Sequence, residues 1–274
     1  NKHIGFEDVM QLQFAVHRVN TKSSSPKLKG AKKCLKKKKK MGLDIRSNFV
    51  VEETWNSISH GVGFFLSIIA TIVTAYHAID YGWEKLVAST VYCVSLLVLY
   101  ASSSLYHSFF KLGTTKMIFQ RLDHAAIFIL IAGSYTPILL GGPLDGYYGR
   151  MLLLFVWFLA LLGIGLVCFF FDQYPVLELS LYLAMGWVSL VIVPVVYNHW
   201  EAFLTGEAFH INGLLWYAAG GVIYTSGVYF FLKGMKVPIH HAVWHVFVLA
   251  ASCCHFIGCF YYVLPTPTPA VPYW

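Results

Sequence analysis

Long apolar runs, separated by short polar segments, repeat along most of the chain. Each run is long enough for an α-helix to cross the hydrocarbon core of a bilayer, which takes about 20 residues. Segments of alternating apolar and polar residues, as membrane β-strands require, do not occur. The pattern predicts an all-α protein, a seven-transmembrane helix bundle, with spans near residues 56–79, 86–110, 117–140, 150–171, 175–197, 209–232 and 238–264.

The composition supports this prediction. Of the 274 residues, 57% are hydrophobic and 12% are charged, whereas a soluble domain carries about 25% charged residues. The predicted helices occupy most of the chain after residue 50, so little sequence is left for a second folded domain. The first 50 residues lack the apolar core and the small-residue cleavage site of a signal peptide. We therefore expect an integral, multi-pass membrane protein.

The first 50 residues form a strongly basic segment. They hold thirteen of the twenty Lys and Arg residues, including the block Lys36–Lys40. Blocks of like charge repel one another, so we expect residues 1–50 to be a disordered cytoplasmic tail and residues 51–274 to be the membrane domain. Lysines beside a membrane attract anionic lipid headgroups, each contributing about 1 kcal/mol. No aromatic residues are interleaved with the lysine run, and we expect no nucleic acid partner.

The same segment has a second interpretation. The chain begins with Asn1, and Met41-Gly42 follows the lysine block. An alternative hypothesis places the native start at Met41, so that residues 1–40 are not part of the natural protein. This alternative affects the tail and leaves the seven predicted spans unchanged.

Basic residues between the runs predict the orientation in the membrane. With the N-terminus in the cytoplasm, the loops after the second, fourth and sixth spans are cytoplasmic and contain five basic residues, against two on the other side. The positive-inside rule therefore favours a cytoplasmic N-terminus and a C-terminus on the opposite side. The five residues are Lys111, Lys116, Arg121, Lys233 and Lys236, and the two are Lys85 and Arg150.

The last apolar run contains the pair His241 and His245. They lie four residues apart and share one face of a helix. Ionisable groups inside a bilayer are costly and usually face a polar partner or a functional cavity. Two neutral imidazoles at this spacing are a natural half-site for Zn²⁺. Hydrogen bonding of both histidines across the helix bundle is the alternative, and the pair alone does not decide between the two.

Further metal-competent groups fall at the same predicted depth. His107 ends the second run, one turn after Ser103, and Asp123 begins the third run. A membrane serine commonly bonds its own backbone, and Arg121 is an alternative partner for Asp123. However, three separate helices place these groups and the histidine pair at one level near the cytoplasmic face. Three histidines with an open fourth position are typical of catalytic zinc, with Asp123 holding a water beside the ion.

The start of the first run contains Glu53, Asn56 and His60. Acidic residues before a helix N-terminus interact favourably with its macrodipole, and Asn56 is a suitable cap. His60 is expected near the membrane edge, where a histidine is unremarkable. These three residues are therefore expected to have structural roles at a helix end.

Taken together, these residues resemble the motifs of the hemolysin III-related family, which includes the progestin and adipoQ receptors. The resemblance covers the chain from about Glu52 to Leu264, and the lysine-rich extension has no counterpart in it. Glu53 matches an acidic position whose role is less clear. The matching motifs are Glu53-x-x-Asn56, His60-Gly61, Ser103-x-x-x-His107, Leu122-Asp123-His124 and His241-x-x-x-His245.

The resemblance implies a fold, a cofactor and a set of site residues. The fold is seven helices with a cytoplasmic N-terminus, and the cofactor is a Zn²⁺ ion near the inner face of the membrane. The family also belongs to a wider group of membrane hydrolases that includes alkaline ceramidases, which implies cleavage of lipid amides. The metal ligands would be His107, His241 and His245, Asp123 would hold the water at the ion, and Ser103 would support it.

Three functions are open at this point. The first is a zinc-dependent hydrolase acting on a membrane lipid, in which zinc activates water, Asp123 is the general base and Ser103 stabilises the oxyanion. The second is a membrane receptor or scaffold in which zinc is structural and uses the same ligands. The third is a pore-forming protein, which is disfavoured because no other span carries a line of charged residues.

Overall fold

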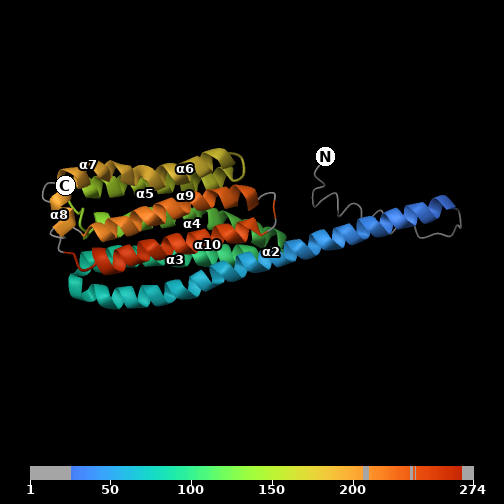
Figure 1. Cartoon of the computed structure of the whole chain (residues 1–274), viewed down its shortest axis with the longest axis horizontal. Coiled ribbons are helices and arrows are strands. Elements are labelled where there is room, and N and C mark those ends of the chain that lie inside the picture. The colour runs from blue at the N-terminus through green and yellow to red at the C-terminus, as the bar shows by residue number, and fades with distance from the viewer. Residues whose placement is uncertain (1–25, 206–209, 235–236, 238, 267–274) are drawn as a thin grey trace. The chain divides into compact units, whose positions relative to one another are not determined.

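The computed structural model describes residues 26–205, 210–234, 237 and 239–266. The internal contacts divide the chain into two units, of which the first ends at Val51 and the second begins at Glu52. The described residues are helices joined by short connections and contain no strand (Figure 1).

The first described element, α2 (Pro26–Ala78), is a single helix of 53 residues. It begins inside the segment that the sequence predicts as a disordered tail, while residues 1–25 lie outside the described residues. Proline is well tolerated at the first position of a helix, and the lysines and leucines that follow are strong helix formers. The backbone from Pro26 onward is therefore helical, because helix propensity outweighs the repulsion between like charges.

Seven segments of the described chain are long and apolar enough to cross a membrane, which confirms the predicted seven-helix bundle. The first, Phe49–Tyr81, consists of the end of α2 and the 3₁₀ turn η1 (Ile79–Tyr81). The others are α3 (Trp83–Ser108), α4 (Gly113–Leu139), α5 (Tyr147–Phe170), the segment Pro175–Asn198, α9 (Ile211–Gly234), and α10 (His240–Gly258) with the π-helical turn η3 (Cys259–Val263).

The fifth span is interrupted. It consists of α6 (Pro175–Trp187), the 3₁₀ segment η2 (Val188–Ile192) and α7 (Val193–Asn198). Pro194 lies in the first turn of α7, where its missing N–H and its ring are incompatible with a continuous α-helix. The short helix α8 (Trp200–Thr205) follows in the connection to α9.

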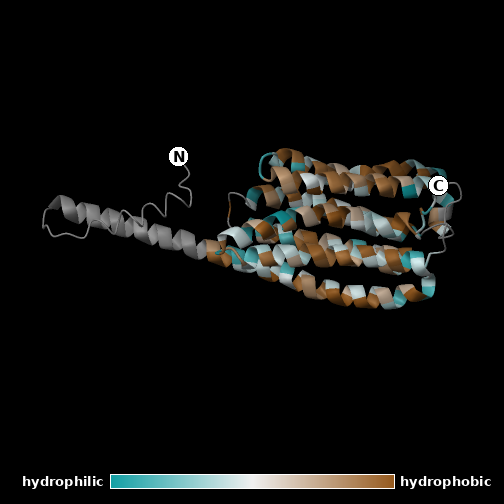
Figure 2. Ribbon diagram, turned by 180° about the vertical axis from the view of Figure 1, so that it is seen from behind, coloured by the Kyte–Doolittle hydropathy of each residue, from teal (hydrophilic) through white to brown (hydrophobic). Residues whose placement is uncertain are grey.

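Two clusters of buried side chains hold the second unit together. The first packs around Phe128 of α4, Val156 of α5 and Met185 of α6, and the second around Tyr92 of α3 and Val248 of α10. Within this unit α3 packs against α4, α4 against α5, and α9 against α10 (Figure 1). Many large apolar side chains are exposed, as expected where lipid rather than water surrounds the helices, and hydrophobic residues recur along every helix of the bundle (brown in Figure 2).

Candidate metal site

Three histidines from two helices meet at one end of the helix bundle. His107 lies in the last turn of α3, and His241 and His245 lie in the first two turns of α10. Each offers one ring nitrogen, and these three nitrogens all lie within 4.8 Å of one another. The ring centroids of His241 and His245 are 4.7 Å apart, and the centroid of His107 is 5.2 and 5.1 Å from theirs. The structure thus brings together the three residues that the sequence predicts as metal ligands.

Helix spacing and a tight connection place the pair on α10. His241 and His245 share a face because they are four residues apart. Ile239, just before α10, has a φ of 70°, a left-handed conformation that is costly for a β-branched residue. Gly234, at the end of α9, packs against His241, since a Cβ at this glycine would lie 2.9 Å from the His241 backbone nitrogen. The start of α10 is therefore held against the end of α9.

A carboxylate from the first span holds the His107 ring. Nδ1 of His107 lies 2.5 Å from Oε2 of Glu53, and both side chains are buried. Since a carboxylate accepts hydrogen bonds, Nδ1 carries the proton and donates. This tautomer leaves Nε2 unprotonated, and Nε2 is buried with no hydrogen-bond partner among the described residues. His107 therefore presents to the cluster the nitrogen that metal binding requires.

His245 is also oriented by the first span, through residues of α2. Its Nδ1 lies 3.2 Å from the backbone oxygen of Asn56 and 3.0 Å from Oγ of Ser59. The Ser59 hydroxyl donates to the same Asn56 oxygen at 2.9 Å, so its proton is committed there. Nδ1 of His245 therefore carries a proton and donates to Asn56, which leaves Nε2 unprotonated and suited to a metal.

A fourth histidine, His60, lies beside the cluster. It is buried and stacks on His245, with ring centroids 3.6 Å and ring planes 12° apart, and its ring meets Tyr100 edge-on. Neither ring nitrogen has a hydrogen-bond partner in the part of the chain that the structure describes. Glu53, Asn56 and His60 are spaced i, i+3 and i+7 on α2, so they share a face. This spacing is the sequence signal that could have indicated their common contact with the site.

Ser103 and Asp123 lie beside the histidine cluster but are not members of it. Ser103 is one turn before His107, and its buried Oγ has no hydrogen-bond partner among the described residues. Asp123 interacts electrostatically with His107 and approaches Ser103, although the two side chains do not reach hydrogen-bond geometry. Arg121, the alternative partner of Asp123, packs its guanidinium over the ring of Phe171 at 5.7 Å. No ion pair between Arg121 and Asp123 is found in the described part of the chain.

The donor set fits Zn²⁺. Three imidazole nitrogens, two of them with the tautomer fixed by a bond at Nδ1, match the pattern of three protein ligands and one open position. The buried Nε2 of His107 and Oγ of Ser103 are costly to leave without partners, and a buried polar atom of this kind calls for an explanation. A metal ion at the cluster would be the partner of Nε2.

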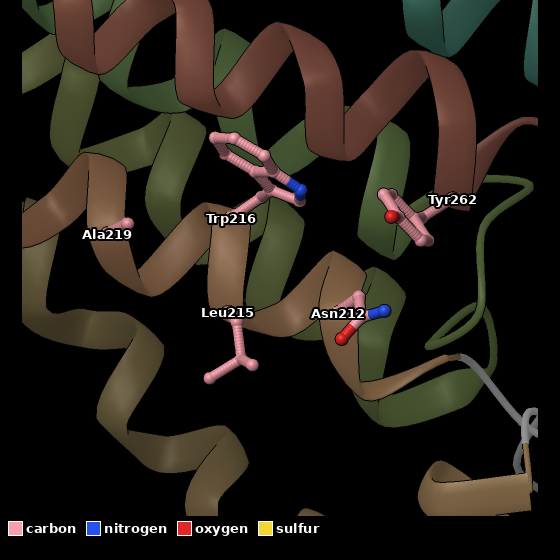
Figure 3. Close-up of a pocket in the computed structure, with 5 residues that line it drawn as sticks. All are labelled: Asn212, Leu215, Trp216, Ala219 and Tyr262. Atoms are coloured by element: carbon pink, nitrogen blue, oxygen red, sulfur yellow. The ribbon is translucent and has the colours of Figure 1, made fainter.

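An open cleft of about 360 Å³ lies far from this cluster. Tyr262 follows His245 by 17 residues, which corresponds to about 25 Å along a helix. The cleft is therefore at the opposite end of the spans and contributes no group to the histidines. It is lined by Asn212, Leu215, Trp216 and Ala219 of α9 and by Tyr262 of η3 (Figure 3).

Comparison with known proteins identifies the family. The model of the family described as Haemolysin-III related matches residues 49–256. The chain belongs to this family. The haemolysin-III related region contains every residue of the histidine site, whereas residues 1–48 lie outside it. The resemblance that the motifs indicate is thereby confirmed.

Individual relatives cover most of the chain. The Hemolysin-3 homolog of Bacillus subtilis (strain 168) is 41% identical over 220 residues, which are 80% of this chain and 97% of the relative. Hemolysin-3 of Bacillus cereus is 42% identical over 221 residues, 80% of this chain and 95% of the relative. The monocyte to macrophage differentiation factor of Homo sapiens is 31% identical over 223 residues, 79% of this chain and 87% of the relative.

Proposed function

We propose that this haemolysin-III related protein binds Zn²⁺ through His107, His241 and His245 and hydrolyses an amide or ester bond of a membrane lipid, as ceramidases do. The observation that carries the proposal is the meeting of three imidazole nitrogens within 4.8 Å of one another, beside a buried serine and an aspartate. Structural zinc sites usually have four protein ligands, whereas three leave a position for water or substrate. Among the described residues, the group of possible metal ligands consists of three histidines, which matches the second case.

The surrounding residues suit hydrolysis. When bound, Zn²⁺ lowers the pKa of a water towards 7 and polarises a carbonyl group. Asp123 is the proposed general base, because its carboxylate lies beside the cluster without belonging to it and can accept the proton of the attacking water. Ser103 Oγ can donate to the oxyanion that develops on the substrate carbonyl. Asp123 then returns the proton to the leaving amine or alcohol.

The proposed substrate and setting follow from where the site lies in the spans. The histidines are near the ends of α3 and α10 that the charge pattern predicts to be cytoplasmic. At this depth a site meets the headgroup and carbonyl region of the inner leaflet, so membrane lipids are the proposed substrates. The lysine-rich N-terminal segment is proposed to bind anionic headgroups of the same leaflet.

Metal analysis and lipid hydrolysis test this proposal together. The purified full-length protein is expected to hold zinc, and His241→Ala is expected to lose it, because the two remaining histidines are a weak site. The zinc-loaded protein is then assayed in detergent micelles with ceramide and with ester lipids. A protein that holds zinc and cleaves none of these lipids would contradict the hydrolase proposal but not the proposal that the site binds zinc.

A receptor or scaffold with structural zinc is the second candidate. It is favoured because the site connects three helices: the ligands come from α3 and α10, and the groups that hydrogen-bond the ligands come from α2. Asp123→Asn separates the two candidates. A catalytic site is expected to keep its metal and lose about 10²- to 10⁴-fold in turnover, whereas a structural site keeps both its metal and its function. Asp172→Asn, an exposed aspartate, is the matched control.

A further inference from the structure

We infer that Glu53 is a positioning residue of the metal site, whose carboxylate holds His107 in the tautomer and orientation that metal binding needs. The inference rests on the proposed zinc site. It adds to that site a residue of the first span, which contributes none of the three ligands.

The position of Glu53 in its helix rules out a role at a helix end. The macrodipole acts on side chains within about the first turn of a helix. The helix α2 begins at Pro26, 27 residues before Glu53. The side chain is also buried, with the residue 6% exposed. Burying a carboxylate costs free energy unless it is paired and hydrogen-bonded, so partners of Glu53 must offset this cost.

Two side chains from different helices satisfy the carboxylate. Oε2 accepts a hydrogen bond from Nδ1 of His107 on α3 at 2.5 Å, and Oε1 accepts one from Nζ of Lys116 on α4 at 3.4 Å. The His107 contact is short and buried, whereas the lysine side chain is partly exposed. Rotation of the Glu53 side chain away from His107 would therefore break contacts to both neighbouring helices.

The contact at Nδ1 determines what His107 can do at Nε2. Metal-binding histidines commonly donate their second N–H to a carboxylate or a carbonyl oxygen, which fixes the tautomer and increases the basicity of the ligand. Both kinds of acceptor occur here, since His107 donates to the Glu53 carboxylate and His245 donates to the backbone oxygen of Asn56. The first span thus orients ligands that the other helices supply, and Glu53 does so through a carboxylate that substitution can remove.

Zinc affinity in Glu53→Gln, compared with Glu52→Gln, tests the inference in the full-length protein. The two variants remove the same charge from adjacent positions, and Glu52 is partly exposed and forms no hydrogen bond with the three histidines in the described structure. In competition with a zinc chelator, Glu53→Gln is expected to weaken binding about 10- to 100-fold and Glu52→Gln less than about twofold. The visible absorption spectrum of the Co²⁺-substituted protein is expected to change in Glu53→Gln alone, because it reports the ligand field rather than global stability.

A second pair of variants covers the case in which Glu53→Gln does not fold. Lys116→Met removes the other contact of the carboxylate and leaves Glu53 in place, so a smaller loss of zinc affinity is expected. Lys111→Met is the control and is expected to bind zinc as the wild type does; Lys111 is an exposed lysine in the turn before α4 and lies over the Phe110 ring.

The outcomes separate this inference from the proposed function. Equal zinc affinities and equal Co²⁺ spectra in Glu53→Gln and Glu52→Gln would overturn the role of Glu53 and leave the zinc site intact. If Glu53→Gln does not fold, equal affinities in Lys116→Met and Lys111→Met would overturn it instead. A wild-type protein that binds no zinc would overturn the proposed function, and this inference with it.

Discussion

Among the single residues of the site, His60 shows what a buried polar ring contributes without hydrogen bonds. Its nitrogens have no partner among the described residues, yet its ring lies flat against His245 at 3.6 Å. Stacking and apolar contact are the favourable parts of this arrangement, and a phenylalanine ring would supply both. An unpaired buried polar group costs about 1–3 kcal/mol. His60 therefore acts as a surface that supports the ring of His245.

The substitution His60→Phe is expected to keep zinc and to raise the stability by about 1 kcal/mol, because the stacking persists and the unpaired nitrogens are removed. Zinc content and the thermal unfolding midpoint in detergent measure the two effects. His245→Phe is the contrasting variant and is expected to lose zinc, since it removes a ligand. Loss of zinc from His60→Phe would show that a nitrogen of His60 takes part in the site.

Sequence reasoning finds the ligands of this site more readily than their supports. The four-residue spacing of His241 and His245 indicates a shared face, and the burial cost of ionisable groups singles out His107 and Asp123 in apolar runs. The role of Glu53 depends instead on a contact between helices, with 54 residues separating it from His107. The periodicity of α2 places Glu53 on one face with Asn56 and His60, but it does not indicate which residue of another helix that face contacts.

Among the secondary-structure elements, the start of α3 and the end of the last span are joined by one lysine. The sequence predicts Lys85 as a loop residue, but the structure buries it in the first turn of α3. Its Nζ donates to the backbone oxygen of Leu264 at 2.7 Å and also to that of Thr266. These oxygens lie just after η3, where a helix leaves its last carbonyl groups without partners. The ammonium group therefore caps the end of the last span.

The substitution Lys85→Met is expected to destabilise the protein by about 1–3 kcal/mol, because it leaves buried carbonyl oxygens without a donor while keeping the length of the side chain. The thermal unfolding midpoint in detergent is expected to fall, and zinc content to stay unchanged, since Lys85 lies at the end of α3 opposite His107. Lys111→Met, which alters an exposed lysine, is the control for the loss of charge. An unchanged midpoint would show that the cap contributes nothing to stability.

The number and order of the spans are predictable, and their limits are less so. Apolar length alone identifies a membrane span, and this criterion finds all seven. The first run is predicted at 56–79, whereas the helix found there is Pro26–Ala78, because helix propensity continues through polar residues at which an apolar count stops. The break at η2 in the fifth span arises from the backbone around Pro194, which hydropathy does not measure.

For the molecule as a whole, the predicted orientation depends on basic residues whose contacts differ between the two ends of the bundle. At the end opposite the histidines, Lys85 binds carbonyl oxygens, and Arg150 binds both carboxylate oxygens of Asp145 and also reaches Glu84. The protein itself thus compensates these two positive charges. At the histidine end Lys116 is paired with Glu53, whereas Lys111 is exposed and has no acidic partner among the described residues. The positive-inside rule counts Lys and Arg residues rather than net charge, so the prediction of a cytoplasmic histidine end still depends on the count of five residues against two.

Cysteine labelling on intact cells tests this orientation. Cys34 of the N-terminal segment and the exposed Cys168 and Cys253 are first replaced by serine. A membrane-impermeant maleimide is then expected to label a cysteine placed at Asp80, at the opposite end, without permeabilisation. A cysteine at Lys111 is expected to react only after permeabilisation, because the predicted orientation places it on the cytoplasmic side together with the site. The reverse pattern would place the histidines on the outer side of the membrane. A substrate from the inner leaflet and a lysine-rich segment bound to cytoplasmic lipids would then both be ruled out, since the site and the segment would face away from that leaflet.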